Sequence, residues 1–203
     1  MINAVTVNRG DRYLPKVSLR QSPFQRNRFQ LSLKTSIIRN FMRRIVIGVM
    51  GRGENATAND LQNAYILGQL IAKQGWILLT GGRNVGVMDA VSKGAKSADG
   101  LTIGILPGKN QDGMSSYVDI AIFTDMGNSR NNINVLSSDL VIACGMGAGT
   151  ASEIALALKA NKQVILLNND EESKLFFKKL SPENVYIVES VERAIATAKT
   201  ILY

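Results

Sequence analysis

The segment IVIGVMGRG at residues 45–53 joins an apolar run to a glycine-rich turn, and this pairing recurs along the chain. An apolar run without polar alternation is typical of a strand that is buried on both faces. Residues 60–74 follow with helical spacing, which brings Leu61, Tyr65, Leu70 and Ile71 onto or near one face. A second apolar run at residues 76–80 ends in a glycine pair. Strands that alternate with helices predict a mainly parallel sheet with helices on both faces.

The same alternation continues to residue 202. We expect further strands at residues 101–106, 118–123, 140–143, 163–168 and 185–188, and helices at residues 87–97, 131–137, 150–160 and 191–202. We interpret Trp76 and the pair Phe176-Phe177 as packing residues. The predicted fold class is α/β, a doubly wound Rossmann-like domain that spans residues 43–203.

Residues 1–42 differ from the rest of the chain. They hold eight of the 24 Lys and Arg residues but one of the 16 Asp and Glu residues, and no helical or strand period is sustained. We expect a disordered basic segment, for which three explanations stay open: a solvated tail, an organelle transit peptide, or sequence upstream of a true start at Met42. The predicted location is cytoplasmic, or organellar if the segment is a transit peptide.

The composition excludes several classes of function. There is no histidine and one cysteine, Cys144, so a zinc site, a serine-histidine triad and an internal disulfide are excluded. Residues 43–203 hold 16 basic and 15 acidic side chains and lack the excess of positive charge typical of a nucleic-acid binder. No apolar run reaches the roughly 18 residues that a membrane span requires. We therefore expect no metal, nucleic acid or membrane partner.

Glycine-rich turns follow three of the predicted strands, where a doubly wound sheet binds its ligands. Glycine allows close approach to the backbone, and the helix that follows each turn offers free N–H groups to an anion. Each turn alone is also explained by the corner it makes, but three at one sheet edge favour a small phosphate-bearing ligand. The candidate residues are Gly51, Arg52, Gly81, Gly82, Arg83, Gly86, Gly145, Gly147, Ala148, Gly149 and Thr150.

The spacing in these turns excludes two common nucleotide sites. The first turn has the form G-x-x-G-x-G instead of the dinucleotide pattern G-x-G-x-x-G, and the second strand ends without a carboxylate for a ribose. NAD is therefore not expected. The P-loop pattern G-x-x-x-x-G-K-[ST] is also missing, which removes support for P-loop hydrolysis of ATP or GTP.

Glu153 and Arg130, near these turns, each have two competing interpretations, and Cys144 has one. Thr150 and Glu153 have the spacing of a helix capping box, and Glu153 is also a candidate site carboxylate. Arg130 is either a solvated turn residue or a fork that holds a phosphate. Cys144 is interpreted as a small buried residue.

Three segments resemble the lonely-guy-like Rossmann superfamily, often mislabelled as lysine decarboxylases. They are LLTGGRNVGVM (78–88), NSRN (128–131) and GMGAGTASE (145–153). Within the superfamily, the chain is most similar to the molybdenum cofactor carrier proteins, which share the form G-x-G-x-G-T-x-x-E and the continuation through Ala157. The likeness extends from about residue 44 to residue 203 and excludes the basic segment.

The resemblance implies a carrier that binds the molybdenum cofactor through the phosphate of molybdopterin, protects it and delivers it to molybdoenzymes. An alternative is a phosphoribohydrolase that releases the base from nucleoside 5′-monophosphates, in which Glu153 and Arg130 would be the catalytic residues. Two departures from the enzyme pattern weigh against hydrolysis: Arg-Lys becomes Arg130-Asn131, and Pro-Gly-Gly becomes Gly145-Met146-Gly147. A nucleotide-ligand sensor is a further alternative. Family members also imply a homodimer or homotetramer.

Overall fold

A parallel sheet forms the centre of the computed structural model, which describes residues 43–167 and 171–203. Within these residues, the sheet has seven strands in the order β4-β3-β2-β1-β5-β6-β7, and every neighbouring pair is parallel. The strands are β1 (Val46–Gly51), β2 (Ile77–Thr80), β3 (Thr102–Leu106), β4 (Ile120–Phe123), β5 (Leu140–Cys144), β6 (Val164–Leu167) and β7 (Val185–Val188). The predicted doubly wound α/β class is confirmed.

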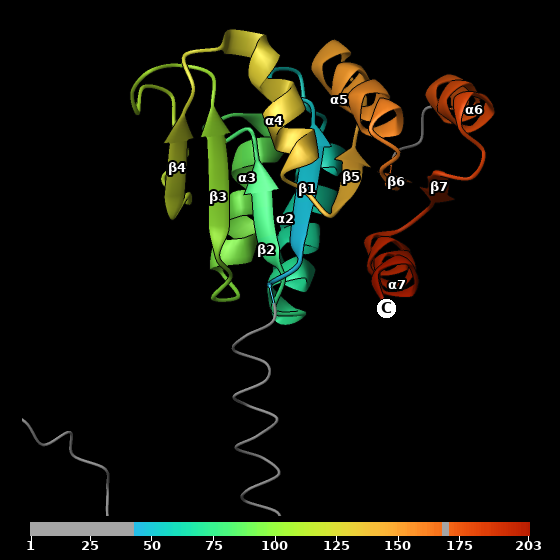
Figure 1. The fold of residues 1–203 in the computed structure, drawn as a ribbon. Helices are drawn as coiled ribbons and strands as arrows, with labels where there is room; N and C mark the ends of the chain where they lie inside the picture. Colours follow the sequence, from blue (N-terminus) through green and yellow to red (C-terminus); the bar gives the residue numbers. More distant parts are fainter. Residues whose placement is uncertain (1–42, 168–170) are drawn as a thin grey trace, which may run out of the picture. The chain divides into compact units, whose positions relative to one another are not determined.

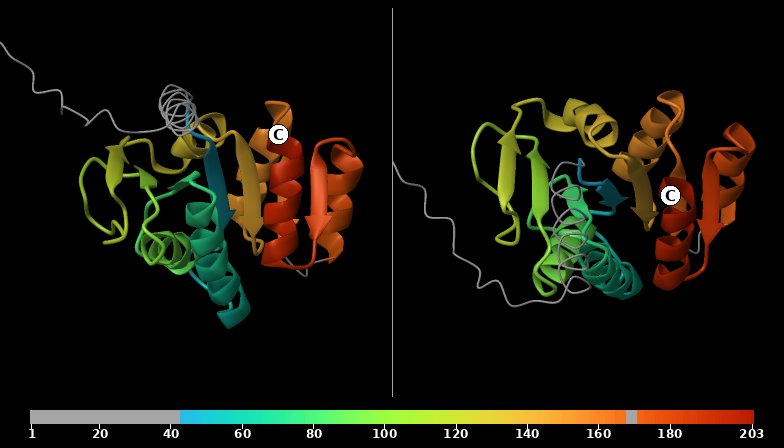
Figure 2. Two further views of the ribbon diagram at one scale, coloured as in Figure 1. Left: turned by 90° about the horizontal axis from the view of Figure 1, so that it is seen from below. Right: turned by 60° about the horizontal axis from the view of Figure 1, so that its bottom comes forward.

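Helices cover both faces of the sheet (Figures 1 and 2). One face carries α2 (Ala58–Lys73), α3 (Gly86–Lys96) and α7 (Val191–Leu202). The other carries α4 (Asn131–Leu136), α5 (Ala148–Lys159) and α6 (Glu171–Leu180), and a 3₁₀ helix, η1 (Gly127–Arg130), leads directly into α4. The predicted helices are all present, with ends that differ by a few residues.

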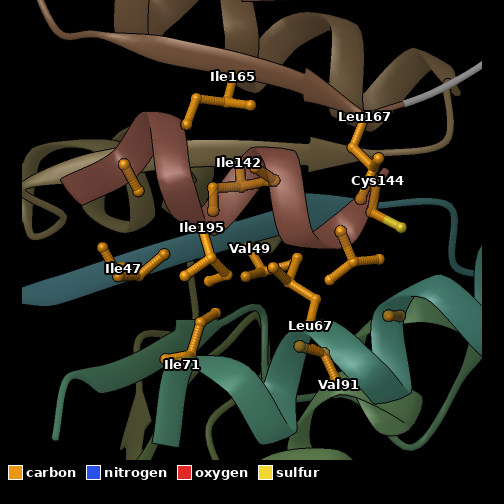
Figure 3. Packing of buried hydrophobic residues seen from close by; sticks show 14 of the residues in the cluster. Ile47, Val49, Leu67, Ile71, Val91, Ile142, Cys144, Ile165, Leu167 and Ile195 are labelled. Atoms are coloured by element: carbon orange, nitrogen blue, oxygen red, sulfur yellow. The ribbon is translucent and has the colours of Figure 1, made fainter. Parts of the chain in front are cut away.

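The core lies between the sheet and these two helix layers. Along β5, Leu140, Ile142 and Cys144 face the layer of α2, α3 and α7, whereas Val141 and Ala143 face the layer of α4, α5 and α6. Every residue of β5 is buried, which explains the unbroken apolar run in the sequence. Figure 3 shows Leu67, Ile71 and Ile195 packed against Ile47 and Ile142 of the first face.

The prediction that the sheet is covered on both faces was wrong at one edge. The edge strand β4 is not covered, and the side chains of Ile120, Ile122 and Phe123 are each 44% exposed. Leu61 is also exposed, because the buried face of α2 is formed by Ala64, Leu67 and Ile71.

The helix α6 was not predicted from the sequence, because its apolar residues do not define one buried stripe. Phe177 is buried and Phe176 is exposed, so only one member of this pair is a packing residue of the core.

The order of the strands determines where a ligand can bind. The chain leaves β1 in one direction through β2, β3 and β4, and then returns to place β5 on the other side of β1. The turns that follow β1 and β5 therefore diverge and open a crevice at the carboxyl ends of these strands. No helix in the described residues is long and apolar enough to cross a membrane. The predicted basic segment, residues 1–42, lies outside the described residues.

Candidate functional site

A pocket of about 450 Å³ lies at the carboxyl ends of β1 and β2, beside the N-terminus of α5. It brings together residues from all three glycine-rich turns and from η1. The predicted site residues that line it are Gly51, Gly81, Arg83, Arg130, Ala148, Gly149, Thr150 and Glu153. These residues are separated by up to 102 positions in the sequence, and the sheet edge gathers them into one site.

Arg130 is the buried cation of the pocket, with 7% of its surface exposed. Its Nη1 donates to Asn131 Oδ1 at 3.0 Å and lies 3.7 Å from Glu153 Oε1, whereas its Nε has no partner among the described residues. Glycine at position 81 makes room for this side chain, because a Cβ there would lie 2.5 Å from Arg130 Nη2. Burial lowers the pKa of Arg130, the charge of Glu153 opposes that shift, and the charge of Arg83 adds to it. A guanidinium nevertheless keeps its proton in proteins.

Glu153 lies beside Arg130 on the first turns of α5 and is 7% exposed. Its Oε1 accepts a hydrogen bond from Asn134 Nδ2 at 2.8 Å. Burial raises the pKa of Glu153, and the hydrogen bond from Asn134 and the charge of Arg130 partly offset that rise. The carboxyl is thus held in place by an amide and a guanidinium that both come from the η1–α4 segment.

The predicted capping box of Thr150 and Glu153 is wrong. The helix α5 begins two residues earlier than expected, at Ala148, and its N-cap Gly147 provides no side-chain cap. Thr150 is therefore the third residue of the helix, and its Oγ1 is buried without a hydrogen-bond partner among the described residues. The N-terminus of α5 presents free backbone N–H groups to the pocket beside this hydroxyl, a combination that favours an anion.

Five of the predicted residues do not line this pocket. Gly82 and Gly86 shape the second turn, at positive φ. Gly145 and Arg52 line a neighbouring cavity of about 470 Å³ between the N-termini of α2 and α7. The Arg52 guanidinium is turned away by a hydrogen bond from its Nε to the carbonyl oxygen of Met146. Gly147 contributes the N-cap of α5.

The structure also adds residues that were not predicted as site residues. Glu54 lines the pocket, as does Asn128 of the NSRN segment, and Asn134 positions Glu153. Asn134 follows Arg130 by four residues, a spacing that places the two on one face of a helix and could have identified it. Cys144 is buried as predicted, and burial raises the pKa of its thiol to about 12.

The chain is similar to proteins of known structure and family. The model of the SLOG cluster4 family matches residues 44–195. A structure described as the molybdenum cofactor binding protein from the phototrophic bacterium Rippkaea orientalis is 63% identical, with a TM-score of 0.79, over 80% of this chain and 99% of that one. The molybdenum cofactor carrier protein MCP from Chlamydomonas reinhardtii is 50% identical, with a TM-score of 0.76, over 79% and 99%.

A curated enzyme provides a more distant match. The cytokinin riboside 5′-monophosphate phosphoribohydrolase of Mycobacterium tuberculosis is 34% identical over 104 residues, which make up 48% of this chain and 53% of the enzyme. The chain thus spans about half the length of that relative. The expected resemblance to lonely-guy-like proteins and to molybdenum cofactor carriers is confirmed, and the chain belongs to the SLOG cluster4 family.

Proposed function

We propose that this protein binds the molybdenum cofactor by its phosphate, shields it and passes it to molybdoenzymes. The observation that carries the proposal is a pair of buried polar atoms without partners, Arg130 Nε and Thr150 Oγ1, in residues that line one pocket at the N-terminus of α5. Buried polar atoms are almost always hydrogen-bonded, so such a pair indicates a missing acceptor. The similarity to two molybdenum cofactor proteins identifies a phosphate-bearing cargo.

The phosphate would lie against the first turn of α5. Its oxygens would accept hydrogen bonds from the N–H groups of Ala148, Gly149 and Thr150 and from the Thr150 hydroxyl. Arg130 would supply positive charge to the phosphate. It lies at the end of η1 and is buried, so its guanidinium stays inside the pocket. The pterin end would extend toward the turns after β1 and β2, where Gly51, Gly81 and Arg83 line the pocket.

The pocket suits a carrier better than a hydrolase in one respect. Asn131 stands where the enzyme pattern has a lysine, and it is buried, accepting from Arg130 and donating to Ser152 Oγ at 3.0 Å. It therefore provides no second cation next to Arg130. Carriage needs only binding and burial, so it does not depend on a second cation at this position.

Delivery requires contacts with other proteins, and we include these in the proposal. The molybdoenzyme partner would approach the mouth of the pocket to receive the cofactor. Self-association into a homodimer or homotetramer would use the helices beside the pocket, where Leu136 at the end of α4 is 55% exposed. Sedimentation velocity at several protein concentrations tests the oligomeric state directly.

A retention experiment tests the binding role. The purified protein is mixed anaerobically with molybdopterin cofactor and passed through gel filtration, and the cofactor in the protein peak is quantified as its fluorescent oxidation product. We expect wild type to retain the cofactor and Arg130→Ala to lose most of it. Arg193→Ala removes an exposed arginine from α7 and is the matched control. Equal retention by Arg130→Ala and wild type would refute the proposal.

A second candidate function rests on the carboxylate. Glu153 lies 3.7 Å from Arg130 in the same pocket, and these are the two residues that the resemblance assigns to phosphoribohydrolases. A buried carboxylate of this kind can stabilise an oxocarbenium-like centre or position water. Incubation with AMP and other nucleoside monophosphates tests for released base. Base release that disappears in Glu153→Gln but persists in Glu192→Gln would show that the protein is a phosphoribohydrolase and would overturn the carrier proposal.

A further inference from the structure

Two turns that border the pocket are joined to each other through their backbones. The N–H of Val87, at the start of α3, donates to the carbonyl oxygen of Arg52 at 2.9 Å. Gly86 has a φ of +57°, and a Cβ at this position would overlap the carbonyl oxygens of Gly53 and Arg52. The turn after β1 and the turn after β2 are therefore fixed against one another. This backbone contact holds side chains of the two turns close together.

These two turns carry a pair of opposite charges at the mouth of the pocket. Arg83 Nη2 lies 3.6 Å from Glu54 Oε1, and both residues line the pocket. Their side chains are 42% and 76% exposed, in contrast to the buried Arg130 and Glu153. An exposed pair of this kind contributes little to stability, and its geometry is easily rearranged.

The backbone around Arg83 is held in place, whereas its side chain is 42% exposed. Arg83 pairs with Met114 in an isolated antiparallel bridge, and Asn84 N–H donates to Gly113 carbonyl oxygen at 2.9 Å. Arg83 is also close enough to Arg130 for its charge to lower the pKa of that residue. The pocket thus has one buried cation, Arg130, and a second cation, Arg83, that is paired with the exposed carboxylate of Glu54.

We propose that Glu54 is a specificity-determining residue that competes with the ligand for Arg83. In the ligand-free protein Glu54 pairs with Arg83, and an entering phosphate displaces it so that Arg83 and Arg130 hold the phosphate together. This inference rests on the proposed function, because it takes the pocket to be a phosphate site. It adds the pair of residues that would favour a monoester with two negative charges over a diester with one.

The selectivity follows from charge. Displacing Glu54 and placing an anion beside it opposes binding of any phosphate group. The attraction to the two arginines and the repulsion from Glu54 both scale with the charge on the ligand. Because the arginines would contact the phosphate and the displaced Glu54 would lie farther from it, a monoester dianion gains more than a diester monoanion. A ligand whose phosphate is extended into a diester would therefore bind less tightly than the monoester, even where the pocket has room for the added group.

Titration calorimetry on the full chain tests this inference. The probes are phenyl phosphate, which is mainly a dianion at pH 8, and methyl phenyl phosphate, a diester with one charge. We expect wild type to prefer the monoester, and Glu54→Gln to bind it about two- to fivefold more tightly, the range expected for loss of an exposed ion pair. Arg83→Ala should weaken monoester binding and reduce the preference. Glu192→Gln makes the same charge change at α7 and should leave both affinities unchanged.

The double variant separates pairing from simple repulsion. Glu54→Gln should give a clearly smaller gain in an Arg83→Ala background, since only the repulsion between Glu54 and the ligand is left to relieve. An equal gain in that background would show that Glu54 acts by repulsion alone and would overturn the inference. Equal binding of the two esters by wild type, or no gain in Glu54→Gln when Arg130→Ala still weakens binding, would overturn it and leave the phosphate site standing. No binding of either ester by wild type would overturn both.

Discussion

Replacing Thr150 by valine should change stability and ligand binding in opposite directions. Valine has nearly the shape of threonine and is also β-branched, so the substitution removes the hydroxyl with little change in packing. The Thr150 side chain is in α5 and 2% exposed, and its Oγ1 has no partner among the described residues. The ligand-free protein therefore loses no hydrogen bond within the described residues when this hydroxyl is removed.

The expected magnitudes follow from these facts. A buried hydroxyl without a partner opposes folding by about 1–3 kcal/mol, so we expect Thr150→Val to raise the free energy of unfolding by about 1 kcal/mol. For a domain of this size that corresponds to a rise in Tm of about 2–4 °C. A hydrogen bond to a charged phosphate contributes about 1.5–3 kcal/mol, so the affinity for a phosphate monoester should fall about ten- to 150-fold.

Thermal melting without ligand and calorimetry with phenyl phosphate measure the two effects separately. Thr150→Ser keeps the hydroxyl and should retain most of the affinity, which separates the hydroxyl from the methyl group. The reasoning is refuted if Thr150→Val melts below wild type while Thr150→Ser does not. The hydroxyl would then stabilise the ligand-free fold, and its apparent lack of a partner would say nothing about a ligand.

Three further predictions concern pH, reactivity and backbone geometry. Because burial raises the pKa of Glu153 above 4.5, wild type should lose stability as the pH rises from about 4.5 through the folded-state pKa. The Tm of Glu153→Gln relative to wild type should therefore increase across that window, and a pH-independent difference would contradict this. Cys144, with a pKa of about 12, should resist maleimide at pH 8 in the native protein and react fully in guanidinium chloride, as followed by mass spectrometry. Gly86→Ala should lower the Tm by about 2–10 °C, because a Cβ at positive φ meets the Gly53 carbonyl oxygen, whereas Gly108→Ala, with open space around it, should not.

The sequence predicted the sheet and its helices because burial on both faces leaves a clear signal. Each central strand is an unbroken apolar run, as β5 shows, and each is bounded by glycine or a polar residue. The signal weakens toward the two edges of the sheet. The exposed strand β4 has the same composition as a buried one, and α6 mixes buried Phe177 with exposed Leu175, Phe176 and Leu180. Local pattern therefore identified the elements without revealing which of them the fold leaves uncovered.

The candidate site was predicted in part. The position of glycine-rich turns after strands places Gly51, Gly81 and Gly149 at one sheet edge, and the structure gathers them in one pocket. The direction in which each side chain points could not be predicted from the sequence. Arg52 turns to the carbonyl of Met146 and lines the neighbouring cavity, although it is next to Gly51. The start of α5 was also misplaced, because a glycine N-cap without a side-chain bond leaves weaker evidence than the Thr150–Glu153 spacing.

Glu153 need not be catalytic to be required in this pocket. A buried guanidinium is costly unless an opposite charge accompanies it, and Glu153 is the carboxylate that lies 3.7 Å from Arg130. Asn134 fixes that carboxylate through α4, so η1, α4 and α5 together hold Arg130 in place before a ligand enters. A carrier thus has its own reason to contain the glutamate that a phosphoribohydrolase uses for cleavage. The two roles differ in one measurable respect: if Glu153 only supports Arg130, Glu153→Gln should weaken retention of the cofactor in a protein that releases no base from AMP.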